Sequence, residues 1–157
     1  MAEKLIPQHI KQEILSVLPY QPPFLFVDEL IEISDQGAKG CYTYDPEADF
    51  YRGHFRNNPV TPGVILTETM AQIGVVCLGI YLLKGELSNE QKPQIALTSH
   101  QIDFFLPVLP GAKVTAVSEK VYFRFQKLKC NVKMFNDNEE LVCRGTISGM
   151  LTSGNHE

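Results

Sequence analysis

Three residues on a short stretch of this 157-residue chain have the types and spacing for acid–base chemistry beside a carbonyl group. His54 can accept a proton near neutral pH. Glu68 is the only charged residue between Arg56 and Lys84, and burial of such a carboxyl raises its pKa toward that of a general acid. Gly63 falls in the first turn of a predicted helix, where free amides can bind a carbonyl oxygen. Together these groups suit proton removal next to a carbonyl and loss of a β-leaving group.

Each of the three residues also has a purely structural interpretation. Glu68 could bond nearby backbone or Gln72, because a buried carboxyl needs a partner. A loop histidine such as His54 is more often a surface residue, and Pro62-Gly63 could simply shape a loop-to-helix corner. The other histidines, which stand on a polar helix face, in a strand and in the tail, suit catalysis less: His9, His100 and His156.

Patterns typical of several other site classes are missing from the sequence. It has no GxSxG elbow, no HExxH pair and no glycine-rich phosphate or dinucleotide loop. Its four cysteines form no CxxC pair and fit no metal-ligand spacing: Cys41, Cys77, Cys130 and Cys143. We therefore expect reduced thiols in a cytoplasmic protein, with no metal and no organic cofactor.

The elements that must position the three residues are a long helix and a run of strands. Thr61 is a suitable helix cap, Pro62 suits the first helical position, and the apolar run continues to Leu83 on every side of the helix, which indicates burial. A shorter amphipathic helix is predicted over 8–18, an irregular and functional loop over 45–62, and a turn at 136–138. Strands are predicted over 28–33, 40–44, 94–105, 113–125, 128–135 and 141–151. Short connections favour antiparallel pairing, so the fold class is α+β with a central helix.

Composition is that of one ordinary soluble domain. The 14 Lys and Arg residues against 18 Asp and Glu residues give a net charge of −4, which argues against a general nucleic-acid binder. The most apolar run, residues 73–83, is shorter than the roughly 20 residues that span a bilayer, so we expect no membrane span. No signal peptide is recognisable at the N-terminus. We expect a single domain over 1–157, with an N-terminal helix within 1–18 and a flexible tail at 152–157.

The motifs around these residues resemble those of a known family. Residues 53–64 read GHFRNNPVTPGV and residues 68–72 read ETMAQ, which is similar to the active-site signature of the 3-hydroxyacyl-acyl-carrier-protein dehydratases of the FabZ type. Residues 18–28 resemble the family's LPHRxPFLLVD motif, and residues 107–111 resemble its PVxPG turn. The related FabA type carries Asp at the acid position, so Glu68 favours the non-isomerising FabZ type.

This resemblance implies a hotdog fold, an antiparallel sheet wrapped around a long central helix. It implies reversible dehydration of a (3R)-hydroxyacyl thioester to the trans-2-enoyl thioester, with His54 as base and Glu68 as acid. The amides of Gly63 and Val64 would bind the thioester carbonyl. Further substrate contacts are expected from four residues of the same motifs: Phe55, Pro62, Met70 and Gln72.

The resemblance also implies partners. The substrate would arrive on an acyl carrier protein. The chain would form a homodimer, and such dimers often assemble into trimers; His54 of one subunit would face Glu68 of the other. No cofactor is implied.

The sequence departs from the family pattern at two places. The family often has His where this chain has Tyr20, and Arg where it has Gln21. Before the PVxPG turn the family usually carries basic residues that grip the acidic carrier protein, but residues 103–106 read DFFL. A different basic patch could replace them, drawn from six cations: Arg52, Arg56, Lys120, Arg124, Lys127 and Lys129. The altered stretch also leaves a specialised lipid or polyene pathway open beside general fatty-acid synthesis.

Two other functions remain open at the level of sequence. A hotdog thioesterase would use an acid to activate water and would release free thiol without forming an enoyl product. A non-catalytic subunit would pair with another hotdog chain, although such a subunit has no need of His54 and Glu68.

Overall fold

The structure, a computed structural model, describes residues 6–83 and 94–152. Its helices are α1 (Gln8–Ser16), α2 (Phe50–Gly53), α3 (Gly63–Met70), the π-helical segment η1 (Ala71–Val76) and α4 (Cys77–Leu82). Its strands are β1 (Glu29–Ser34), β2 (Gly37–Thr43), β3 (Gln94–Phe104), β4 (Lys113–Arg124), β5 (Lys127–Asn136) and β6 (Leu141–Thr152).

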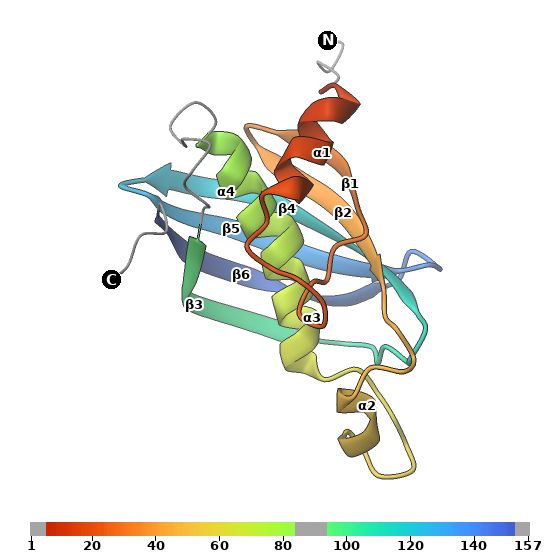
Figure 1. The fold of residues 1–157 in the computed structure, drawn as a ribbon. Helices are drawn as coiled ribbons and strands as arrows, with labels where there is room; N and C mark the ends of the chain where they lie inside the picture. The colour runs from red at the N-terminus through yellow and green to blue at the C-terminus, as the bar shows by residue number, and fades with distance from the viewer. Residues whose placement is uncertain (1–5, 84–93, 153–157) are drawn as a thin grey trace, which may run out of the picture.

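The six strands form one antiparallel sheet in the order β1-β2-β4-β5-β6-β3. The helices that follow one another from Gly63 to Leu82 cross one face of this sheet, and α1 packs on the same side (Figure 1). The predicted antiparallel α+β architecture and the hotdog fold are confirmed. Strand β3 forms one end of the sheet, and its far edge has no strand partner within residues 6–83 and 94–152.

The central helix forms the core. Over its 20 residues, Gly63–Leu82, the mean hydropathy reaches 1.7 and 78% of the most apolar window is buried inside the protein. Its length and composition would allow it to cross a membrane, but it lies against the sheet as a core helix. A helix that is apolar on every side is stable only when it is enclosed in this way.

The middle of this helix is a π turn, which the sequence did not predict. The Ser118 hydroxyl on β4 donates a 2.7 Å hydrogen bond to the Gly74 carbonyl within η1. A Cβ atom at Gly74 would lie 2.8 Å from the Ser118 Cβ, so only glycine allows the strand to approach the helix here. At Gly79 a Cβ atom would lie 2.4 Å from Leu151 Cδ2, so the sheet packs closely against the helix at both glycines.

The start of the helix corrects one prediction. Thr61 does not cap the helix; Pro62 occupies the cap position without a side-chain bond, and the helix begins at Gly63. The Thr61 hydroxyl lies 2.6 Å from the Tyr51 hydroxyl instead, because Tyr51 is buried beside it. Tyr51 belongs to α2, a short helix inside the segment predicted to be irregular.

The remaining elements lie close to their predicted ranges. Predicted residues 1–5 of the N-terminal segment and 153–157 of the tail lie outside the described residues, and Thr152 belongs to β6.

All four cysteines are free and buried, and burial raises the pKa of Cys77, Cys130 and Cys143 to about 12. Thiols with such pKa values are unreactive near neutral pH.

Candidate functional site

Glu68 lies on α3, partly buried, in the second turn of the central helix. Its Oε2 accepts a 2.9 Å hydrogen bond from Gln72 Nε2, the partner that the structural interpretation expected. Burial raises the pKa of the carboxyl, and the bond from Gln72 lowers it in part. Within the described residues no hydrogen bond reaches Oε1, so this oxygen is left for a proton or a ligand.

Gln72 fixes the carboxyl to the N-terminal part of the chain. Its Nε2 also donates to the Phe24 carbonyl at 3.1 Å, and its Oε1 accepts from the Phe26 amide at 2.8 Å. The Gln72 side chain is fully buried. Because all its bonds are to protein groups, it orients Glu68 as a positioning residue, a role that the sequence did not assign.

Tyr20, where the sequence departs from the family motif, is a second residue near the Glu68 carboxyl. It is half-buried, its ring lies 6.4 Å from that of Phe24, and the negative charge of Glu68 adds to burial in raising the pKa of its hydroxyl. Tyr20 therefore stays a neutral phenol at physiological pH, in the place where the family often has His. The departure from the motif was the signal that could have drawn attention to it.

His54 is held in one tautomer by its neighbours. Its Nδ1 lies 2.9 Å from the Val60 carbonyl, and the Val60 amide donates to the His54 carbonyl at 2.9 Å. A carbonyl can only accept, so Nδ1 carries the proton and the neutral ring has its lone pair on Nε2. The ring stacks on Phe55 with 3.9 Å between centroids. An oriented imidazole with a free Nε2 can act as a general base.

His54 and Glu68 make no direct bond to each other within the described residues. No hydrogen bond or ion pair joins His54 and Glu68 in the described structure, where the one ion pair is Arg52–Asp49. General acid–base catalysis on one substrate needs both groups at the same reacting atoms, with the substrate between them.

The helix start provides the third group. The Ile65 and Leu66 amides both donate to the Pro62 carbonyl, at 2.9 and 3.1 Å. The Gly63 and Val64 amides have no acceptor in the described part of the chain. Helix dipoles make such amides a binding site for a partly negative oxygen.

A cavity of about 430 Å³ opens at this helix start. Gly63 and Leu66 line it on the helix side, and residues 104–108 line it on the other. The Phe104 ring lies over Gly63, where a Cβ atom would come 3.1 Å from the ring edge. The cavity is therefore an open hollow with mixed polar and apolar lining, and Gly63, one of the two residues with a free amide, forms part of its wall.

The other predicted substrate contacts lie in different surroundings. Phe55 is 54% exposed beside His54, whereas Pro62 is buried at the helix start. Met70 is fully buried and accepts a contact of 3.8 Å from the Cys143 thiol. Contact of these residues and Gln72 with a substrate stays a prediction.

Residues 6–83 and 94–152 contain no group of three His, Cys, Asp or Glu side chains arranged to hold a metal ion.

Comparisons with known proteins agree with this geometry. The model of a family described as "FabA-like domain" matches residues 18–146. The 3-hydroxyacyl-[acyl-carrier-protein] dehydratase FabZ of Caldicellulosiruptor bescii is 33% identical over 136 residues, 86% of this chain and 93% of that protein. The FabZ of Sinorhizobium medicae is 34% identical over 146 residues, 90% of this chain and 89% of that protein.

Two solved structures share the fold. One is the dehydratase heterocomplex ApeI:P from Xenorhabdus doucetiae, with a TM-score of 0.73, 12% identity, and coverage of 88% of this chain and 90% of that one. The other is a thioesterase from Haemophilus influenzae, with a TM-score of 0.58, 14% identity, and coverage of 82% and 80%. At these identities the likeness shows the hotdog fold alone.

Proposed function

We propose that this chain, which belongs to the FabA-like domain family with FabZ dehydratases as relatives, catalyses reversible dehydration of (3R)-hydroxyacyl thioesters to trans-2-enoyl thioesters. The observation that carries the proposal is the state of Glu68. Its carboxyl has a raised pKa, is held through one oxygen by Gln72, and keeps the other oxygen free. This is the state that a general acid needs in order to protonate a departing hydroxyl.

The reaction follows from the three groups. His54 Nε2 takes the proton from C2, and the electron pair of that C–H bond forms the C2=C3 double bond. The C3–O bond breaks as the Glu68 proton passes to the hydroxyl, which leaves as water. The Gly63 and Val64 amides bind the thioester oxygen, where negative charge builds up during proton removal. The reaction as proposed needs no metal or organic cofactor.

The complete site is proposed to form between two subunits. No hydrogen bond or ion pair joins His54 to Glu68 within the described residues, and there the long edge of β3 is exposed and has no strand partner. Pairing of two such edges would join two sheets and bring His54 of one subunit to Glu68 of the other. The proposed assembly is a homodimer, with three such dimers as the proposed larger assembly. A (3R)-hydroxyacyl chain on an acyl carrier protein is the proposed substrate, and the cytoplasm is the proposed compartment.

An assay of enoyl absorbance tests the function. The purified protein would receive crotonyl and longer enoyl thioesters on carrier protein and on coenzyme A, together with His54→Ala and Glu68→Gln as controls. Loss of the enoyl signal with wild type alone is the expected result. Release of free thiol without hydration would assign a thioesterase instead, and an unchanged substrate with thiol still bound would contradict an independent enzyme.

A further inference from the structure

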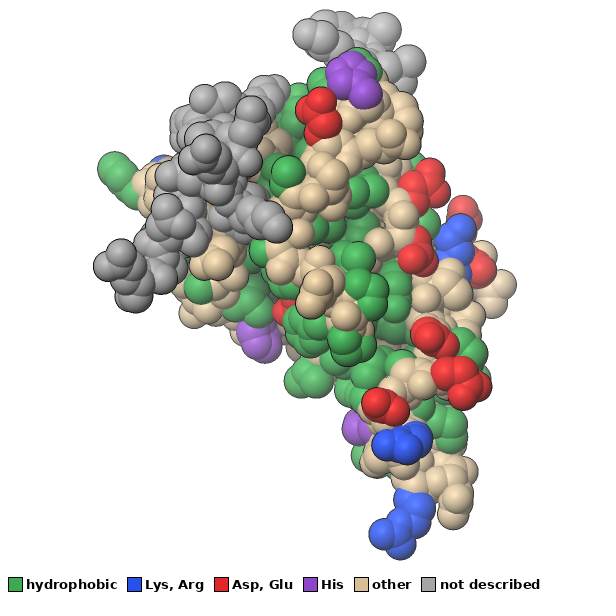
Figure 2. Space-filling view, viewed as in Figure 1, with side chains coloured by type: hydrophobic (Ala, Val, Ile, Leu, Met, Phe, Trp, Pro, Cys, Tyr) green, Lys and Arg blue, Asp and Glu red, His purple; other side chains and the backbone are tan. Residues whose placement is uncertain are grey.

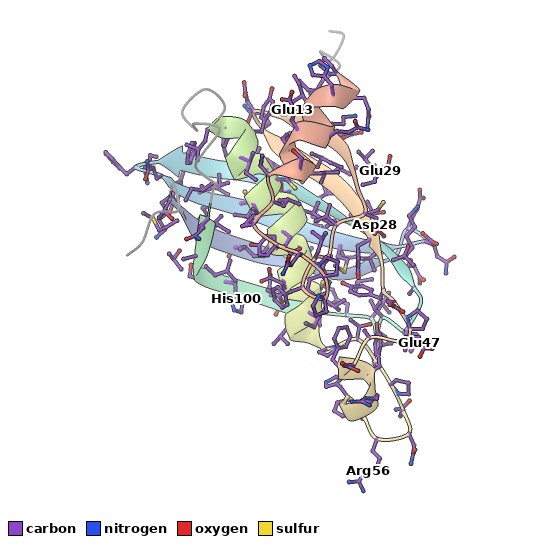
Figure 3. The ribbon with its side chains drawn as sticks, viewed as in Figure 1. Glu13, Asp28, Glu29, Glu47, Arg56 and His100 are labelled. Carbon is purple, nitrogen blue, oxygen red and sulfur yellow. The ribbon has the colours of Figure 1, made fainter. Side chains whose placement is uncertain are left out.

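The described charges divide between the two faces of the molecule. On the face that carries the helices, acidic side chains gather along α1, β1 and the segment before α2, where Glu13, Asp28, Glu29 and Glu47 lie (Figures 2 and 3). The opposite face of the sheet is covered by none of the described helices (Figure 1). The whole chain has a net charge of −4, so a cationic area on that face needs a separate explanation.

Cations gather on this uncovered sheet face. Lys127, Lys129 and Lys133 alternate along β5 with buried residues, so their side chains point away from the helix. The neighbouring strands add Arg124, directly opposite Lys127, and Arg144, directly opposite Lys133. We call these five residues the cationic face: Arg124, Lys127, Lys129, Lys133 and Arg144.

These cations have no anionic partner in the described structure. The one ion pair there, between Arg52 and Asp49, lies elsewhere. Four acids stand at outward positions of the sheet, Asp103 opposite Arg144, Glu119 on β4, and Glu29 and Glu32 on β1, and none comes within ion-pair distance of a cation in the described structure. The two acids of β1 lie three strands away from β5, so the five cations outnumber the acids nearest to them, Asp103 and Glu119, and the face can attract an anionic surface.

One end of the cationic face meets the mouth of the cavity. The Arg144 guanidinium lies 5.7 Å from the centre of the Phe105 ring, and Phe105 lines the cavity together with Gly63. The Phe105 amide also donates to the Val142 carbonyl on β6 at 2.8 Å, two residues before Arg144. A partner bound over Arg144 and Lys133 would therefore stand beside the opening to the free amides.

We propose that the cationic face, anchored at Arg144 and Lys133, is the docking surface for the acidic carrier protein that presents the acyl thioester; this rests on the proposed function. Charge complementarity selects the partner, since cations at an interface rim accelerate and orient encounter with an acidic protein. The surface also replaces the missing basic stretch, because residues 103–106 read DFFL and supply no cation.

The structure separates the six cations that the sequence suggested. Lys120 lies close enough to Cys130 to lower the pKa of that thiol, at an inward position of the sheet. Arg52 belongs to α2, and Arg56 lies at the far tip of the molecule (Figure 3). Arg124, Lys127 and Lys129 remain, and Lys133 and Arg144, which sequence reasoning missed, bring the patch to the cavity.

Kinetics with two forms of one acyl group test the docking surface. The double variant Arg144→Glu/Lys133→Glu would be assayed on crotonyl carried by a purified acidic acyl carrier protein and on crotonyl-pantetheine, which is uncharged. We expect kcat/KM on the carrier substrate to fall by about tenfold or more, mainly through KM, with values on pantetheine within about twofold of wild type. Raising the salt concentration should weaken wild type on the carrier and affect the variant less.

Lys39→Glu is the matched control. Lys39 stands in the same cross-strand row as Lys133 and Arg144 but on β2, roughly 14 Å from Arg144 at the usual strand spacing. This variant should stay within about twofold of wild type on both substrates. The neutral pair Arg144→Gln/Lys133→Gln, expected to shift KM in the same direction by a smaller factor, guards against misfolding of the charge-reversed protein.

The possible outcomes distinguish failure of the proposed docking surface from failure of the proposed function. A wild type inactive on both substrates contradicts the proposed function. If wild type is active on both, an unchanged carrier KM in Arg144→Glu/Lys133→Glu, or an equal loss on pantetheine, overturns the docking surface. Binding of wild type to phosphatidylglycerol vesicles that this variant loses, with carrier kinetics unchanged, would assign the face to a membrane instead.

Discussion

The two halves of the central helix differ in whether they present polar groups without a hydrogen-bond partner. The first half, α3, offers two unpaired amides at Gly63 and Val64, and Glu68 stands on it with one free carboxyl oxygen. The second half is closed, and every residue from 71 to 80 is buried. The comparison shows that one helix serves two purposes: the buried half holds the fold, and this support allows the other half to keep unsatisfied groups ready for a ligand.

Loss of either acid–base group in the open half should have the largest effect, and that effect should be on catalytic activity. Glu68→Gln removes the proposed proton donor and His54→Ala the proposed proton acceptor, so each should lower kcat by about 10²- to 10⁴-fold. Thermal unfolding should show a fold that survives both changes. Enoyl hydration rates measure the effect, and near-normal turnover in either variant would refute the role of that residue.

Truncation in the closed half should produce the opposite pattern. Leu78 is fully buried on α4, so Leu78→Ala should lower the free energy of unfolding by about 2–5 kcal/mol through lost burial and a new cavity. Folded protein should keep kcat within about threefold of wild type, because Leu78 touches none of the three reacting groups. Denaturant unfolding gives the first quantity and initial rates the second. A loss of turnover comparable to that of Glu68→Gln, in folded protein, would erase the distinction between the halves.

Gly63→Ala tests the open amides directly. The new methyl group would lie 3.1–3.4 Å from three carbon atoms of the Phe104 ring, so the ring must move into the cavity by a few tenths of an ångström. We expect kcat/KM to fall roughly tenfold, because the methyl group and the displaced ring obstruct the approach of the thioester oxygen. Thermal stability should change little at this half-buried position. Unchanged kcat and KM would show that the carbonyl binds elsewhere.

A smaller effect concerns how the ionised Glu68 carboxylate changes the stability of the fold. An acid whose pKa is raised by folding stabilises the protein fully below its unfolded pKa and loses that contribution as pH rises through the folded pKa. Glu68→Gln should therefore raise Tm by roughly 1–2 °C near pH 8 relative to wild type, with the difference vanishing near pH 4. Melting curves at both pH values measure it. A variant less stable than wild type at pH 8 would mean that the carboxylate stabilises the fold.

Sequence reasoning located the elements because their signals are local. The apolar run on every side of residues 63–82 predicts a buried helix by itself, and the alternation along β4, β5 and β6 predicts strands. Glu68 could be selected because it is the only charge in that run. The fold class therefore followed from residue patterns, and the hotdog topology from the motifs that the chain shares with its relatives.

The missing parts of the prediction depend on contacts between distant residues. Thr61 is a good local helix cap, but Tyr51 binds its hydroxyl in the folded chain. Within the π turn the Gly74 carbonyl accepts a hydrogen bond from Ser118, 44 residues further along the sequence. Arg144 joins the cationic face only through the pairing of β6 with β5, which places it opposite Lys133. Such tertiary contacts have no signature in a window of neighbouring residues.

Subunit complementation tests the central claim, a dehydration site built from His54 of one subunit and Glu68 of its partner. Purified His54→Ala and Glu68→Gln proteins would be mixed under conditions that exchange subunits, and enoyl hydration would be measured before and after. Random exchange leaves half of the dimers mixed, each with one complete site of two, so activity should rise to about a quarter of that of wild type taken through the same exchange. A mixture that stays as inactive as its components, while exchanged wild type remains active and subunit exchange is verified by mass, would contradict the account.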